Sequence, residues 1–316
     1  MSTLNEADPA LSGVQTSGEP GASPFGTILT AMITPMNDDL SVDYNGAAKL
    51  ANYLVDLGND GLVVSGTTGE SPTTTDSEKL GLLEVVLEAV GDRARVIAGA
   101  GTNNTAHSVE LATAAADAGA HGILAVTPYY NKPPVEGVIK HYETLAEVSD
   151  LPIMLYDIPG RTGLALEPET LVRLAEIPQI VAVKDAKGDL ESVVEVMSAT
   201  DLLWYSGDDG LNLAFLSIGA TGFVSVTGHL VADRLRAMRE AFLAGRVDEA
   251  KQINESLQPV STGIFRSQGA IMTKAALNEL ELPAGPMRLP LVDATPVETA
   301  QLIIDLAEGG VQGFTP

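Results

Sequence analysis

The sequence of 316 residues contains no cysteine and only four histidines. The lack of cysteine excludes disulfide bonds, thiolate catalysis, iron–sulfur clusters and cysteine-built zinc sites. None of the histidines has an HExxH spacing, so we expect no histidine-built metal site; they are His107, His121, His141 and His229. No apolar run reaches the roughly 18 residues that a membrane-spanning helix needs.

Basic residues are also scarce, since 18 Lys and Arg face 42 Asp and Glu for a formal net charge of −24. Binding to nucleic acid requires clustered Lys and Arg, and so does binding to an anionic membrane. Both classes of partner are therefore excluded. We interpret the acidic surface as favouring solubility. An anionic substrate would need a few cations placed at its own site.

Residues 1–24 hold no Lys or Arg and no apolar segment of the kind found in a secretory signal. Their Ser, Gly, Pro and Glu content predicts a flexible N-terminal tail. We therefore expect a cytoplasmic protein.

Eight short apolar runs recur along the chain, and each is followed by a polar turn. They are nearly continuous in Val, Ile, Leu and Ala, as expected of parallel strands buried on both faces. The runs are Thr27–Thr34, Gly61–Ser65, Arg95–Ala100, Gly122–Thr127, Pro152–Asp157, Ile180–Asp185, Leu203–Ser206 and Thr221–Val226. Helical patterns lie between them, for example Tyr44–Leu57, Ser77–Val90 and Ala106–Ala118, with Ser77 as a candidate N-cap and Gly91 as a candidate end of its helix.

Eight evenly spaced strand–helix units predict an α/β fold, a (β/α)8 TIM barrel over residues 25–245. A doubly wound open sheet is the alternative. From about Arg246 the pattern is helical without strands, at Asp248–Leu257, Gly269–Leu280 and Pro296–Ala307. We therefore expect a small all-helical C-terminal domain over residues 246–316.

Chemistry in such a barrel lies where strands end, and Lys184 stands at the end of the sixth apolar run. A lysine there is costly to bury, because desolvation disfavours its charged form. It either pairs with a carboxylate such as Asp185 or serves as an amine of lowered pKa that forms an imine with a carbonyl. This residue alone does not separate the two interpretations.

Other candidates also have a structural and a functional interpretation. Tyr156 is a core residue or, beside an imine-forming lysine on the adjacent strand, a proton shuttle. Thr67 and Thr68 form a turn or offer hydroxyls to a carboxylate. Arg161 makes a surface ion pair or a bidentate carboxylate clamp.

Three further signals are discounted. The sequence Gly99–Gly101 lacks the third glycine of a dinucleotide loop. Asp208 and Asp209 have no third metal ligand and are interpreted as loop hydrogen bonders, and His229 has no visible nucleophile and is interpreted as structural.

Four motifs then identify a family. GTTGES at Gly66–Ser71, TPYYN at Thr127–Asn131, YDIPGRTG at Tyr156–Gly163 and VKDA at Val183–Ala186 resemble those of the dihydrodipicolinate synthases, Schiff-base-forming pyruvate aldolases of the N-acetylneuraminate lyase superfamily. The resemblance runs from about Phe25 to the C-terminus. Asp157 is a departure, because the family more often has asparagine there.

The resemblance implies a reaction and a set of roles. Pyruvate forms a Schiff base with Lys184 and condenses with L-aspartate 4-semialdehyde to give 4-hydroxy-tetrahydrodipicolinate, on the route to lysine and diaminopimelate. Tyr156 transfers protons, and Thr67 links it to Tyr130, which reaches across a subunit interface. Thr68 and the Val224 carbonyl bind pyruvate, and Arg161 binds the second substrate; no cofactor or metal takes part, and the enzyme is a homotetramer, a dimer of dimers.

Sister aldolases on the same barrel, N-acetylneuraminate lyase or a keto-deoxy sugar acid aldolase, share the lysine and the tyrosine. Arg161 and the Tyr129–Tyr130 pair favour the synthase, because a short dicarboxylate-like adduct needs a cation where a sugar chain needs hydroxyl partners. A non-catalytic binding homologue should have lost the lysine or the tyrosine.

The resemblance also bears on inhibition by L-lysine. Lysine-sensitive members bind the effector at an interface through five positions, of which this chain keeps the asparagine and tyrosine as Asn103 and Tyr129. The two histidine-type positions hold Asp76 and Lys79, and the glutamate position holds His107. Because the glutamate should pair with the effector's amino group, we expect no inhibition by lysine.

Overall fold

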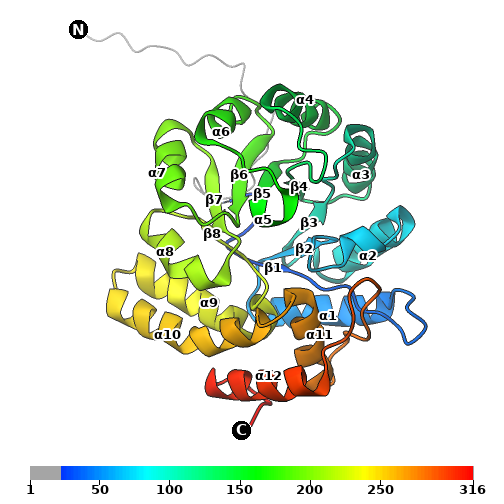
Figure 1. The fold of residues 1–316 in the computed structure, drawn as a ribbon, viewed down its shortest axis with the longest axis vertical. Helices are drawn as coiled ribbons and strands as arrows, with labels where there is room; N and C mark the ends of the chain where they lie inside the picture. Colours follow the sequence, from blue (N-terminus) through cyan, green and yellow to red (C-terminus); the bar gives the residue numbers. More distant parts are fainter. Residues whose placement is uncertain (1–22, 316) are drawn as a thin grey trace.

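The computed structural model describes residues 23–315. Within them, eight parallel strands close into a barrel in chain order, and β8 pairs with β1 (Figure 1). The strands are β1 (Ile28–Ala31), β2 (Gly61–Val64), β3 (Arg95–Gly99), β4 (Gly122–Val126), β5 (Ile153–Asp157), β6 (Ile180–Asp185), β7 (Leu203–Ser206) and β8 (Gly222–Ser225). The predicted barrel is confirmed, and all eight apolar runs contain a strand. Most of the predicted tail, residues 1–22, lies outside the described residues.

Apart from the short helix that follows β5, which overlaps the strands in this view, the helices lie outside the strands, as the alternation of the sequence predicted (Figure 1). Those of the barrel are α1 (Tyr44–Asp56), α2 (Asp76–Val90), α3 (Thr105–Asp117), α4 (Val135–Ala146), α5 (Pro159–Thr162), α6 (Pro168–Leu174), α7 (Leu190–Ala199), α8 (Asn212–Ser217) and α9 (Gly228–Leu243). Three more follow: α10 (Val247–Ile264), α11 (Gly269–Glu279) and α12 (Pro296–Glu308). No helix of residues 23–315 is long and apolar enough to cross a bilayer.

Two predicted helix boundaries were wrong. The N-cap of α2 is Thr75 and not Ser77, because Thr75 and Glu78 exchange hydrogen bonds as a capping box, which requires a Glu three residues after the cap. Helix α10 does not end at Leu257 but continues through Pro259 to Ile264. The proline removes one backbone hydrogen bond, but burial of Val260 and Ile264 in the core outweighs that loss.

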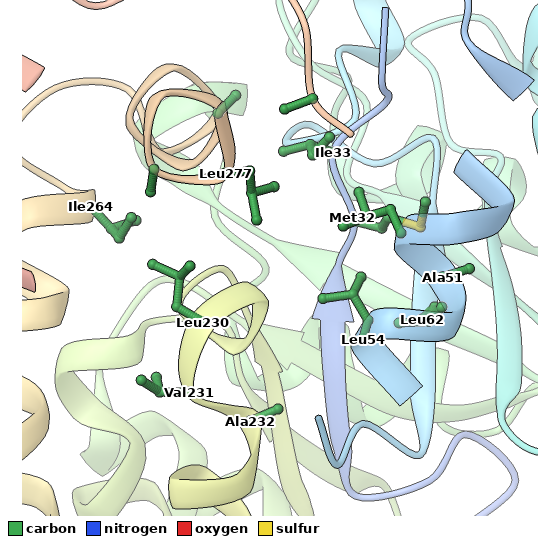
Figure 2. Close-up of a cluster of buried hydrophobic side chains, with 14 of the residues drawn as sticks. Met32, Ile33, Ala51, Leu54, Leu62, Leu230, Val231, Ala232, Ile264 and Leu277 are labelled. Atoms are coloured by element: carbon green, nitrogen blue, oxygen red, sulfur yellow. The ribbon is translucent and has the colours of Figure 1, made fainter. Parts of the chain in front are cut away.

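The largest core cluster joins the barrel to the C-terminal helices. Figure 2 shows Met32 and Ile33, which follow β1, in one cluster with Leu230 of α9, Ile264 of α10 and Leu277 of α11. The C-terminal helices therefore pack where the chain leaves the carboxyl end of β1.

The barrel interior is filled by side chains, and Phe25 closes its amino-terminal end. Phe25 is fully buried just before β1, and its ring stands edge-on to that of Tyr205, with centroids 6.3 Å apart. The Tyr205 hydroxyl donates to the Gly26 carbonyl at 2.8 Å, which anchors the segment. The opposite, carboxyl-terminal end remains for a site.

Candidate active site

Lys184 and Tyr156 are neighbours at the carboxyl end of the barrel. They occupy paired positions on β6 and β5, and Nζ of Lys184 lies 4.2 Å from the centroid of the Tyr156 ring. Lys184 is only 5% exposed. Burial lowers the pKa of Lys184 to about 8, with the Arg161 charge acting in the same direction and Asp209 opposing it. The lowered pKa makes the uncharged, nucleophilic amine more accessible near neutral pH than in an exposed lysine.

An ion pair between Lys184 and Asp185, the structural alternative for this lysine, is absent from the described residues. Asp185 instead accepts hydrogen bonds from the backbone N–H groups of Lys187 and Gly188, each at 2.9 Å. Asp185 is therefore not the ion-pair partner that the structural interpretation of Lys184 requires. Gly207 leaves room for the lysine, because a β-carbon there would lie 2.9 Å from Cε of Lys184.

Tyr156 keeps its proton at neutral pH. Burial raises the pKa of Tyr156 to about 12, although the Arg161 charge and a hydrogen bond with the Thr67 side chain lower it. A protonated phenol beside an amine of lowered pKa can donate a proton and recover it through a hydroxyl neighbour. Thr67 is that neighbour, so the structure brings Lys184, Tyr156, Thr67 and Arg161 together.

Thr67 and Thr68 lie on the loop Gly66–Ser71, which follows β2 and which we call the substrate loop. The backbone N–H of Glu70 donates to the Thr67 carbonyl at 3.2 Å, and that of Ser71 donates to the Gly66 carbonyl at 3.3 Å. These bonds fold the loop into a tight turn. The segment is thus a turn closed by backbone hydrogen bonds, which leaves the functional alternative for the two threonine hydroxyls open.

Arg161 stands on the short helix α5 at the edge of the site. Its Nη2 donates to Oε1 of Gln268 at 2.8 Å. Gln268 is the N-cap residue of α11 and was not among the predicted site residues. No local pattern could have found it, because the contact joins residues 107 positions apart.

A cavity of about 480 Å³ opens at this end of the barrel. Thr67, Tyr156 and Arg161 line it, together with Tyr129. Lys184 is not part of its lining and lies beneath the Tyr156 ring.

Besides Lys184, three predicted site residues lie apart from this cavity's lining. Thr68 is half-buried in the substrate loop, and Val224 is fully buried in the barrel interior on β8. Tyr130 is 88% exposed and has a left-handed backbone, with φ of 72°. Within one chain Tyr130 therefore points to solvent and does not meet Tyr156.

The discounted acidic and histidine residues hold the end of β8 in place. Asp209 accepts hydrogen bonds from the Ser225 hydroxyl at 2.5 Å and from the backbone N–H groups of Val226 and Thr227 at 2.9 Å. His229 is fully buried and accepts from the backbone N–H of Ile33 at 3.1 Å. Their structural interpretation is supported, and Asp209 also adds negative charge near Lys184.

A charged cluster stands at the mouth of the cavity. Nε2 of His107 lies 2.9 Å from one carboxylate oxygen of Asp76, and Nζ of Lys79 lies 3.4 Å from the other. All three residues line the cavity. Lys79 therefore already balances the charge of Asp76, and His107 contacts the other oxygen of this carboxylate.

Comparison with known proteins agrees with this geometry. Residues 24–308 match the model of the dihydrodipicolinate synthetase family. The 4-hydroxy-tetrahydrodipicolinate synthase 2 of Streptomyces coelicolor is 60% identical over 290 residues, which cover 92% of this chain and 97% of the relative. The 4-hydroxy-tetrahydrodipicolinate synthase of Acidothermus cellulolyticus is 58% identical over 292 residues, 92% of this chain and 95% of the relative.

Solved structures give the same result. The crystal structure of dihydrodipicolinate synthase from Cyanidioschyzon merolae with lysine bound superposes with a TM-score of 0.89 at 42% identity, over 91% of this chain and 99% of that one. The crystal structure of dihydrodipicolinate synthase from Bacillus anthracis superposes with a TM-score of 0.87 at 42% identity, over 89% of this chain and 97% of that one. The chain therefore belongs to the dihydrodipicolinate synthetase family.

Proposed function

We propose that Lys184 carries the 4-hydroxy-tetrahydrodipicolinate synthase reaction of this chain as a Schiff base with pyruvate. The activity, a lyase step of lysine biosynthesis, follows from identities above half to curated synthases over more than nine-tenths of the chain. The residue roles rest on one observation. The buried amine of Lys184, with its lowered pKa, lies against the Tyr156 ring at the end of the barrel.

The first half of the reaction uses pyruvate alone. The neutral amine of Lys184 attacks the keto carbon, and Tyr156 donates the proton with which the keto oxygen leaves as water. The resulting iminium withdraws electrons from the adjacent methyl group. Loss of a methyl proton then gives an enamine, a carbanion equivalent, and Tyr156 and Thr67 move the protons. Thr68 and the Val224 carbonyl hold the substrate.

The second half joins the aldehyde. The enamine carbon attacks the aldehyde carbon of L-aspartate 4-semialdehyde, and the new alkoxide takes a proton from the relay. The substrate's own amine then attacks the imine carbon and displaces Lys184, which closes the ring. One water is released overall, so the product holds the atoms of both substrates less one H₂O. Arg161 is the cation at the cavity that can receive the second carboxylate as a planar fork.

We also propose that the active enzyme is a cytoplasmic homotetramer, a dimer of dimers. Tyr130 supports this assembly, because an aromatic side chain 88% exposed on a left-handed backbone lacks a role within one chain. In the proposal Tyr130 enters the neighbouring subunit's site and completes the relay through Thr67.

Borohydride trapping tests the role of Lys184. Incubation with pyruvate and borohydride should leave a reduced adduct on the peptide that contains Lys184, and Lys184→Ala should abolish both the adduct and most turnover. Lys187→Ala is the matched control, because this half-buried lysine lies three residues away and outside the cavity. An adduct on another lysine would refute the mechanism. Sugar-acid aldehydes assayed beside the semialdehyde test the substrate.

A further inference from the structure

We propose that Glu70 and Lys274 form a positioning pair, through which the C-terminal helix α11 fixes the geometry of the substrate loop. Neither residue lines the cavity, so their effect passes through Thr67 and Thr68. The inference rests on the proposed function, because it takes these two hydroxyls to meet the reacting groups.

Glu70 belongs to the tight turn that carries both threonines. It is only 2% exposed, and its backbone is left-handed with φ of 56°. That conformation is unfavourable for a residue with a β-carbon, so it persists only where the surroundings hold it. The Glu70 backbone N–H donates to the Thr67 carbonyl at 3.2 Å. Any relaxation at Glu70 therefore moves Thr67 directly.

Both carboxylate oxygens of Glu70 are held by the C-terminal part of the chain. Nζ of Lys274 on α11 lies 2.6 Å from Oε1, with both side chains at most 2% exposed. The backbone N–H of Arg288 donates to Oε2 at 2.9 Å. The ammonium also donates to the Pro286 carbonyl at 2.8 Å, so Lys274 ties α11, the 286–288 segment and the loop together.

Other contacts dock the same C-terminal segment independently of Glu70. The Arg288 guanidinium donates to Glu78 at 2.6 and 2.8 Å and to the Thr73 carbonyl at 2.9 Å. The Met36 backbone N–H donates to the Ala284 carbonyl at 3.0 Å. Because these contacts remain when Glu70 is neutralised, we expect such a variant to fold while the loop loses its fixed geometry.

The pair differs from an ordinary buried ion pair in what its loss should change. A buried charge without its partner destabilises a protein. This loss of stability is expected both if the pair is purely structural and if it also positions the loop. Only a positioning role predicts weaker binding of pyruvate in folded protein. Displacements of about 1 Å around a reacting group slow reactions by up to about a hundredfold.

Three variants separate the roles: Glu70→Gln, Lys274→Met and the double variant Glu70→Gln/Lys274→Met. The double variant leaves no unpaired charge, so it should recover much of the melting temperature lost by Lys274→Met. We expect the pyruvate concentration for half-maximal borohydride trapping to rise about tenfold to a hundredfold in all three. Arg266→Gln is the control, because it removes an ion pair with Asp305 in the same C-terminal region away from the loop. It should lower the melting temperature and leave pyruvate saturation unchanged.

A second comparison locates the effect on the loop. In a Thr67→Val/Thr68→Val background, Glu70→Gln should cause no further rise in the half-maximal pyruvate concentration, because the hydroxyls it positions are gone. If folded Glu70→Gln/Lys274→Met reached half-maximal trapping at the wild-type pyruvate concentration, this inference would be overturned and the proposed function would stand. A wild-type chain that forms no adduct at Lys184 would overturn the proposed function and this inference together.

Discussion

Asp157 is a buried carboxyl group that should make the protein less stable as the pH rises. It is 1% exposed, and its register partner on β6, Asp185, is buried beside it. Its oxygens accept one backbone N–H, that of Leu166, at 3.3 Å. Burial raises the pKa of Asp157 to about 7, and the charge of Asp185 adds to the rise. The change Asp157→Asn keeps the shape and the acceptor oxygen but removes the charge.

The sign and size of the effect follow from linkage between protonation and folding. The pKa of Asp157 in the folded protein lies above the usual aspartate value of 3.8, so between these two values the folded protein binds more protons than the unfolded chain. The stability that this raised pKa contributes is fully present below pH 4 and is lost as the pH rises to 7. The whole loss is about 4 kcal/mol, because one pKa unit corresponds to about 1.4 kcal/mol. Between pH 5 and pH 8 the loss is roughly 2–3 kcal/mol.

Urea denaturation at pH 5 and pH 8, at one ionic strength, measures this difference. We expect the stability advantage of Asp157→Asn over the wild-type protein to be larger at pH 8 by roughly 2–3 kcal/mol. Asp189→Asn is the control, because hydrogen bonds from Ser192 lower the pKa of this exposed N-cap residue, the opposite direction. An equal effect of Asp157→Asn at both pH values would refute the reasoning.

Three further predictions concern assembly, specificity and inhibition. Tyr130→Phe should lower kcat while adduct formation at Lys184 survives; a monomer with full activity in sedimentation and rate measurements would contradict the shared site. Arg161→Lys keeps the charge but loses the fork geometry, so the semialdehyde KM should rise far more than pyruvate trapping changes; equal effects would argue against the assignment. L-lysine should not inhibit, because Lys79 already pairs with Asp76 and His107 occupies its other oxygen. Saturable inhibition below 1 millimolar, a level that a binding energy of about −4 kcal/mol would reach, would show the opposite in initial rates or calorimetry.

The barrel could be predicted because its signal is local and repeated. Each strand that is buried on both faces appears in the sequence as an apolar run, and each helix appears as apolar residues repeated with the helical period. The end of a helix was predicted wrongly where core packing overrides local helix propensity, as at Pro259, which lies within α10. A helix-breaking residue says little about a helix that the core holds together.

The centre of the site could also be predicted, because strand register places Lys184 beside Tyr156 once the barrel is known. The contacts made by the C-terminal helices could not. Arg161 meets Gln268, and Glu70 meets Lys274, across more than a hundred and two hundred positions respectively. Such pairs depend on where one helix packs on the barrel, and no sequence period reports that.

Phe25 closes the amino-terminal end of the barrel, so the interior can be reached only from the carboxyl-terminal end. A molecule bound for Lys184 must come from the cavity side, where the Tyr156 ring lies beside the amine. In the proposed mechanism, pyruvate and product therefore share the carboxyl-terminal end of the barrel as their route to and from Lys184.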